Sequence, residues 1–122
     1  MPVRGIRGAT TCQEDAESIL VATRELLSAI LTANPSLRAT DIASAWFTVT
    51  SDLQLVHPAK AAREIGWTEV PLMCAREIDV PGSLPHCVRV LIHWNTDLPQ
   101  SAVRPVYLHD AKTLRPDLDH EN

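Results

Sequence analysis

The stretch of residues 87–94, with the sequence CVRVLIHW, restricts the fold more than any other part of the chain. Its β-branched and aromatic residues alternate at the spacing of a strand with two distinct faces. One face would carry Val88, Val90, Ile92 and Trp94, and the other Cys87, Arg89, Leu91 and His93. Because the second face is also mostly apolar, the pattern predicts a strand covered on both sides. Arg89 would then be partly enclosed and need an anion, unless it lies on an edge strand and reaches water.

Length and charge limit the classes of protein that are compatible with this strand. A chain of 122 residues predicts one domain, spanning 1–122, with a core but no room for a second domain. Its formal net charge of −4 argues against a broad nucleic-acid-binding surface. The sequence has no apolar run long enough to span a bilayer and no signal-peptide core at its start, so we expect no membrane contact.

The cysteines and histidines argue against disulfides and metal sites. Cys12, Cys74 and Cys87 are odd in number and form no C-x-x-C motif, which is typical of a protein in the reducing cytoplasm. The five histidines show no metal-ligand spacing either. The sequence therefore predicts a cytoplasmic protein without a metal.

Hydrophobic periodicity and turn residues predict four strands, two helices and a last short strand or turn at 103–108. The strands are expected at 3–10, 45–50, 70–78 and 87–94, and the helices from the capping-box sequence 11–14 to Asn34 and from His57 to Gly66. This order predicts an α+β (α/β-like) fold, a mixed sheet with helices on one face. The other face would be buried against further subunits, which predicts a closed oligomer with ligand clefts between its subunits.

The spacing of the basic residues predicts which of their side chains share a face of a strand or helix. Arg4 and Arg7 are three apart in a strand and so point to opposite faces. Lys60 and Arg63 are three apart in a helix and share a face. A solvated basic face is the simpler interpretation of this second pair, and Glu64 could pair locally with Lys60.

A set of cations with one carboxylate remains after the standard motifs are searched for. Neither a nucleophile motif nor a phosphate-binding loop occurs in the sequence. The remaining set is Arg7, Lys60, Arg63, Arg89 and Arg115, with Glu77, Cys74 and Tyr107. Strict alternation separates Cys74 from Glu77, so their strand must end or bulge between them if both line one site. Such a set suits a small polycarboxylate whose reaction needs positioning and charge stabilisation more than proton transfer.

These residues belong to segments whose order resembles that of a known family. The segments are VRGIRGATT at 3–11, PAKAARE at 58–64, CARE at 74–77, RV at 89–90, NTD at 95–97, VYL at 106–108 and LRPDL at 114–118. Together they closely resemble the small monofunctional bacterial chorismate mutases of the trimeric pseudo-α/β-barrel type. The resemblance covers nearly the whole chain. It implies a homotrimer whose sheets pack into a barrel-like core, with active sites at the subunit interfaces.

The resemblance also implies an activity, the rearrangement of chorismate to prephenate in the shikimate pathway to phenylalanine and tyrosine. This unimolecular, pericyclic Claisen step is the work of an isomerase and requires no metal and no organic cofactor. Arg89 would face the ether oxygen of chorismate as the key catalytic cation. Arg7 and Tyr107 would bind carboxylates, with Arg7 also near the ether oxygen. Glu77, with Cys74 beside it, would accept the hydrogen bond of the ring hydroxyl.

Further residues would line the pocket by the same resemblance. The neighbouring subunit would supply His57, Ala59, Lys60 and Arg63, and the C-terminal segment would close over the site with Leu114 and Arg115. Two positions depart from the family pattern. The family usually has Phe where this chain has His57, so substrate packing there would be looser or pH-sensitive. It has a small polar residue where this chain has Met73, which leaves a substrate contact by this side chain open.

Two other functions are compatible with the sequence. The imine hydrolases of the Rid/YjgF type form trimers of similar shape and bind carboxylates through an interface arginine. They lack the set of Arg7, Glu77, Arg89 and Tyr107, which argues against them. The other function is a non-catalytic trimer that binds an aromatic-pathway metabolite. The presence of Arg89 together with Glu77 favours catalysis over it, because carboxylate capture alone would not need both.

Overall fold

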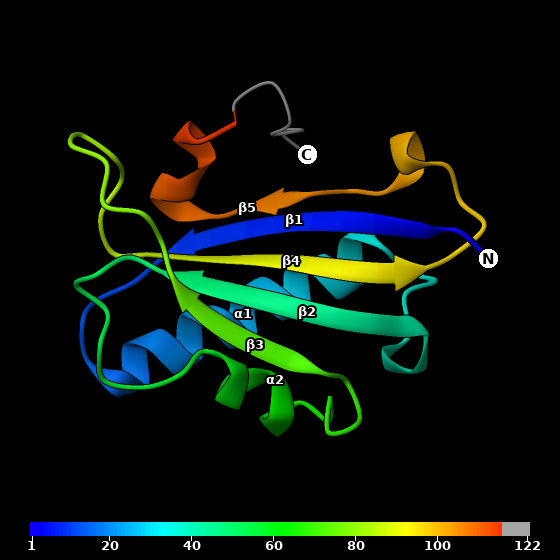
Figure 1. The fold of residues 1–122 in the computed structure, drawn as a ribbon, viewed down its shortest axis with the longest axis horizontal. Coiled ribbons are helices and arrows are strands. Elements are labelled where there is room, and N and C mark those ends of the chain that lie inside the picture. Colours follow the sequence, from blue (N-terminus) through cyan, green and yellow to red (C-terminus); the bar gives the residue numbers. More distant parts are fainter. Residues whose placement is uncertain (116–122) are drawn as a thin grey trace.

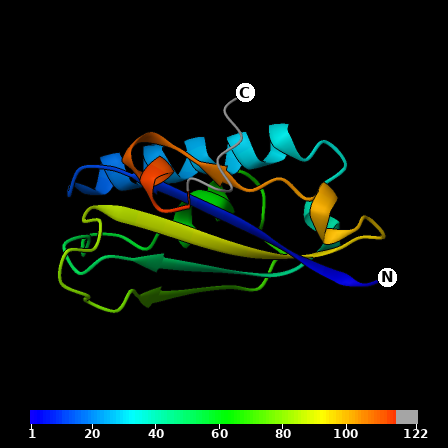
Figure 2. The ribbon, with the colours of Figure 1, turned by 90° about the horizontal axis from the view of Figure 1, so that it is seen from above.

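A mixed sheet covered on one face by two helices makes up the fold of residues 1–115, the part that the computed structural model describes (Figures 1 and 2). The strands are β1 (Val3–Thr11), β2 (Ile42–Val49), β3 (Leu72–Arg76), β4 (Cys87–Asn95) and β5 (Val106–Tyr107). The helices are α1 (Ala16–Ala33) and α2 (Ala59–Glu64), with short 3-10 turns η1 (Ala39–Asp41), η2 (Gln100–Ala102) and η3 (His109–Thr113). The predicted α+β fold, a mixed sheet with its helices on one face, is confirmed. Over the same residues, no helix combines the length and the apolar character needed to cross a membrane.

β4 lies at the centre of the sheet, whose strand order is β3-β2-β4-β1-β5. It pairs antiparallel with β1 along one edge and with β2 along the other. β3 and β5 lie at the two edges of the sheet, where they run parallel to β2 and β1 respectively. Because β4 has hydrogen-bonded neighbours on both sides, the alternative of an edge-strand Arg89 is wrong.

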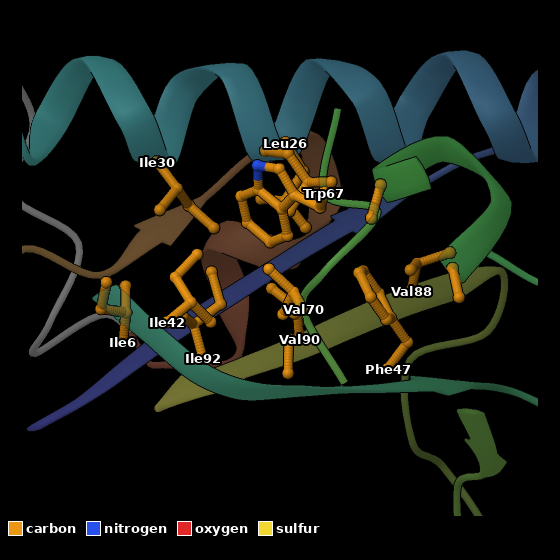
Figure 3. Close-up of a cluster of buried hydrophobic side chains, with 14 of the residues drawn as sticks. Ile6, Leu26, Ile30, Ile42, Phe47, Trp67, Val70, Val88, Val90 and Ile92 are labelled. Carbon is orange, nitrogen blue, oxygen red and sulfur yellow. The ribbon is translucent and has the colours of Figure 1, made fainter. Parts of the chain in front are cut away.

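The core lies between the sheet and α1. Val88, Val90, Ile92 and Trp94 of β4 are all buried on the helix-facing side, as their alternation predicted. Figure 3 shows Leu26 and Ile30 of α1 pointing toward this side of the sheet, where they lie above Ile92 and Val90. Gly8 of β1 permits the close approach, because a Cβ atom there would lie 2.8 Å from Cδ1 of Ile30.

α1 begins later than its sequence predicted. The capping box expected at 11–14 is wrong, because Thr11 still pairs with Cys87 in the β1–β4 ladder. The first residue of the expected capping box therefore belongs to the sheet, so the helix cannot begin there. Asp15 is the N-cap instead, and its carboxylate accepts the Ser18 N–H at 3.0 Å. The apolar stripe from Ile19 to Ile30 is buried as predicted.

Other bounds shift by a few residues for local reasons. α2 is shorter than the predicted helix at 57–66, with Pro58 as its N-cap and Gly66 just beyond it at φ +102°. β2 starts earlier than predicted, because Ile42 already pairs with Trp94 of β4. β3 begins only after Pro71, which has no N–H to donate to the sheet.

Candidate active site

Two rows of side chains cross the open face of the sheet, the face opposite the helices. Paired residues of neighbouring strands project to the same face, so the register defines the rows. One row runs Met73–Trp46–Leu91–Arg7, and the next runs Ala75–Thr48–Arg89–Ala9–Tyr107. Arg7 and Arg89 therefore lie on the same face from neighbouring strands. Arg4 points to the other face, where its Nε donates to the carbonyl oxygen of Leu98 at 2.8 Å.

A cavity of about 620 Å³ opens on this face. Four of the predicted site residues line it together, namely Arg7, Glu77, Arg89 and Tyr107. They come from β1, from the residue that follows β3, from β4 and from β5, so segments far apart in the sequence meet at this one cavity. Two guanidinium groups, a phenol and a carboxylate facing one space can bind a small molecule that carries both carboxylates and a hydroxyl.

Glu77 and Cys74 do not share this cavity. The backbone of β3 continues in register past its end, because the Glu77 N–H donates to the Val49 carbonyl oxygen at 2.9 Å. No bulge intervenes within this pairing, so alternation places Glu77 on the open face and Cys74 on the helix-facing side, against the core. The expectation that Cys74 lies beside Glu77 at one site is therefore wrong within a single chain.

Cys74 instead lines a second cavity of about 470 Å³, together with His57. This cavity is formed by the end of β2, the loop before α2 and the strand β3. Lys60 and Arg63 are exposed on α2, whereas Ala59 is buried in the core. The suggested local pair of Glu64 with Lys60 is wrong, because Glu64 accepts from Nη1 of Arg24 on α1 at 2.7 Å.

The remaining predicted residues lie near these two regions. Leu114 is partly buried and packs on a small cluster that includes Tyr107 and Cys87. Arg115 is also partly buried and is the last described residue. Residues 116–118, the rest of the segment LRPDL that resembles the family, lie outside the described residues. Met73 is 55% exposed on the open face, next to Trp46 in the register.

Two thiols, those of the buried Cys87 and the partly buried Cys12, are protonated near neutral pH. Burial raises the pKa of the Cys87 thiol, although the neighbouring Arg89 guanidinium acts to lower it. Burial likewise raises the pKa of Cys12 to about 11, and the charges of Cys87 and Asp52 add to the effect. Neither thiol is therefore poised as a nucleophile. In residues 1–115, no group of three or more His, Cys, Asp and Glu residues is arranged to hold a metal ion.

The sequence reasoning missed two polar residues that line the larger cavity, Thr48 and His93. Thr48 pairs directly with Arg89, and His93 lies two positions beyond Leu91 on the same face, with its Nδ1 3.0 Å from the Ser44 hydroxyl. The alternation of residues 87–94 already placed His93 on the face of Arg89. Thr48 could be found only through the register of β2 against β4, which local periodicity does not contain.

The fold and the cavity together define a class, a small α+β protein whose open sheet face presents a cavity lined by two arginines and one carboxylate. Residues 3–118 match the family model described as chorismate mutase type I. A chorismate mutase AroH of Thermus thermophilus is 57% identical over 118 residues, which are 96% of this chain and 97% of that protein. The chorismate mutase AroH of Bacillus subtilis strain 168 is 46% identical over 120 residues, covering 97% and 94%. The chain therefore belongs to the chorismate mutase type I family.

The fold comparison agrees with this assignment. A solved chorismate mutase from Clostridium thermocellum superposes with a TM-score of 0.86 at 48% identity, covering 89% of this chain and 97% of that one. The prediction of a chorismate mutase, and hence of an isomerase, is confirmed by these matches. Neither the imine hydrolase nor the non-catalytic binding protein has support from them.

Proposed function

We propose that the open-face cavity is the place where this chorismate mutase binds chorismate and rearranges it to prephenate. One observation carries the proposal: Arg7, Glu77, Arg89 and Tyr107, predicted from the sequence, line one cavity although they come from four separate segments. Chance grouping of these side chains in a space of about 620 Å³ would be unusual, since pockets of this size are few in a protein.

The reaction matches what such a cavity offers. In the Claisen rearrangement the ether C–O bond breaks while a new C–C bond forms within the same molecule, so no atom, electron or proton leaves or enters. Arg89, partly buried in the sheet, would stabilise the negative charge that grows on the ether oxygen. Arg7 and Tyr107 would hold the substrate carboxylates, and Glu77 would accept the hydrogen bond of the ring hydroxyl. The protonated thiols of Cys12 and Cys87 are consistent with a mechanism that needs no nucleophile.

An assembly of three chains would complete this site. Met73, Trp46 and Leu91 form a continuous row on the open face and are 55%, 43% and 41% exposed. Soluble monomers seldom expose so many large apolar side chains side by side, so further copies of the chain are the expected cover. The resemblance to trimeric mutases supports a homotrimer in which each sheet packs against the other two.

The second cavity would give such a trimer a second wall for each active site. His57 and Cys74 line it, away from the cavity of Arg89 in the same chain, and the exposed Lys60 and Arg63 lie on the neighbouring helix. The family resemblance implies that a neighbouring subunit brings His57, Lys60 and Arg63 to the cavity. Cys74 would come with them, because it lines the same second cavity as His57. Ala59 would contribute through its backbone, because its side chain is buried in its own core. Leu114 and Arg115 would close over the substrate.

We further propose that residues 1–122 form one domain and that the protein works in the cytoplasm. The described residues share one sheet and one main core, which supports the single domain. The three cysteines are free, as in proteins of a reducing compartment.

The test of the proposed site is the loss of chorismate absorbance in the presence of wild type, Arg89→Ala and Arg89→Lys. We expect the wild type to consume chorismate and both variants to lose roughly 100- to 1,000-fold in kcat, the usual effect of removing one preorganised donor. Arg89→Lys should not rescue, because an ammonium lacks the forked geometry of guanidinium.

Arg38→Ala is the matched control, since Arg38 is an exposed arginine outside both cavities. Normal turnover by folded Arg89→Ala would refute the role of Arg89. No turnover by the folded wild type would refute the proposed function itself.

A further inference from the structure

Two buried polar atoms beside the proposed active site lack a hydrogen-bond partner within residues 1–115. They are the hydroxyl oxygen of Thr48 and Nε of Arg89. Leaving a buried polar group unpaired destabilises the folded protein, and the effect is larger for a charged group. An arrangement of this kind persists in native proteins where it serves a purpose, and here both atoms belong to residues that line the substrate cavity.

The two orphaned atoms are neighbours and are chemically complementary. Thr48 and Arg89 are direct register partners of the antiparallel pair β2–β4, so their side chains project side by side on the open face. Cβ atoms of such partners lie about 4.5–5.5 Å apart, within the reach of an arginine side chain. The Nε–H of arginine can only donate, and a threonine hydroxyl has two lone pairs that accept.

Neither substrate nor a further subunit is the natural partner of these atoms. Both atoms are shielded from solvent, so a molecule that fills the cavity or docks on the sheet cannot touch them as they stand. A rotation of the Thr48 side chain between its allowed rotamers moves its hydroxyl without disturbing the strand. The smallest change that satisfies both atoms is therefore the pairing of one with the other.

We propose that Thr48 is a positioning residue for Arg89, whose Nε–H it accepts in the substrate-bound enzyme. This bond would fix the plane of the guanidinium and leave its two terminal amino groups to face the cavity. The inference rests on the proposed role of Arg89 at the ether oxygen. Cys87, two residues before Arg89 on the same face, also interacts with its side chain, so neighbours on two strands would hold it.

Orientation matters because an arginine side chain is long and has many rotamers. A donor contributes to catalysis when it already points to the place where charge develops, with no reorganisation during the reaction. Loss of the Thr48 hydroxyl would free the guanidinium to turn away from that place. The substrate would still bind through its other ligands, so the effect should fall on kcat more than on KM.

The test compares Thr48→Val, which keeps the shape without the hydroxyl, with Thr48→Ser, which keeps the hydroxyl. We expect Thr48→Val to lower kcat roughly 10- to 100-fold, the effect of losing a hydrogen bond to a charged group, with little change in KM. Thr48→Ser should retain most of the activity. Thr10→Val is the matched control, because Thr10 is a buried strand threonine on the helix-facing side of β1.

A second readout does not depend on turnover. With prephenate bound, the Nε–H proton of Arg89 should exchange slowly with solvent in ¹H–¹⁵N spectra of wild type and Thr48→Ser, and faster in Thr48→Val. Wild-type kcat in Thr48→Val, equal loss in Thr48→Ser, or equal exchange rates in all three would each overturn the inference while leaving the proposed function intact. A folded wild type that does not consume chorismate would overturn both.

Discussion

Arg89 shows how the surroundings of a single residue follow from its place in a sheet. It lies on the central strand, with Ala9 opposite it on β1 and Thr48 opposite it on β2. The small Ala9 leaves room for a cavity above the sheet, and the neighbouring strands restrict access of water to the guanidinium. A charge in such a place interacts more strongly with a ligand than the same charge on an open surface.

At the same scale, the thiols of Cys12 and Cys87 predict how stability changes with pH. The pKa of Cys12 is raised from 9.0 to about 11 in the folded protein, chiefly by burial. As pH rises from 9 to 11, the unfolded chain therefore loses this proton while the folded chain keeps it. The unfolded state binds fewer protons in this window, so the free energy of unfolding should fall as pH rises.

Urea unfolding at several pH values between 9 and 11 would test this effect. Cys12→Ala and Cys12→Ser should both show a shallower fall in the free energy of unfolding than wild type. The raised pKa of Cys87 acts in the same direction and should leave part of the slope in place. Identical slopes in wild type and both variants would show that Cys12 does not contribute.

Among the elements, β4 and α1 account for most of the architecture. β4 supplies the buried row of the core on one face and Arg89, which lines the open-face cavity, on the other. α1 covers the core, and a Cβ atom at Gly8 of β1 would lie 2.8 Å from Cδ1 of Ile30 on this helix. The sheet and the helix compete for the residues at the start of α1. The β1–β4 ladder extends through Thr11, so the helix is capped only at Asp15.

The cap of α1 gives a prediction at this scale. Asp15→Ala should lower the free energy of unfolding by about 1 kcal/mol, because the Ser18 N–H would lose its acceptor. Denaturant titration measures the loss. Glu17→Ala is the matched control, an exposed acidic residue in the first turn, and should cost less because it provides no cap. Equal losses in the two variants would show that the helix dipole, and not the cap, dominates.

At the scale of the whole molecule, the open sheet face is the surface on which we expect other subunits to pack. Its apolar row of Met73, Trp46 and Leu91 lies next to the proposed substrate cavity, which Trp46 and Leu91 also line. Covering this face in a homotrimer would therefore bury apolar surface and enclose the active site at the same time. Assembly and catalysis would then depend on the same surface.

Leu91→Glu tests that dependence. A carboxylate at a contact that becomes buried would cost several kcal/mol, so the variant should dissociate at concentrations where wild type is trimeric. Light scattering coupled to size exclusion gives the mass of each species. Val21→Glu is the control, because Val21 is similarly exposed, at 47%, but lies on α1. A monomeric wild type, or a Leu91→Glu variant that stays trimeric, would contradict the proposed assembly.

The sequence by itself determined the features that depend on local periodicity. The alternation of residues 87–94 gave the two faces of β4, and the spacing of Arg4 and Arg7 gave their opposite directions. The apolar stripe of α1 gave the face that it buries. The family was identified from segments that resemble its members and occur in the same order along the chain. In each case the relevant neighbours are close in the chain, so side-chain spacing and backbone geometry are sufficient.

The tertiary structure alone decided which distant residues meet. The strand register places Thr48 beside Arg89. It also places Cys74 and Glu77 on opposite faces of the sheet. The packing of the helices pairs Glu64 with Arg24 and not with Lys60. Strand pairing depends on hydrogen bonds between segments that are far apart in sequence. A one-residue shift in such pairing would turn every side chain to the other face, and no local pattern fixes it.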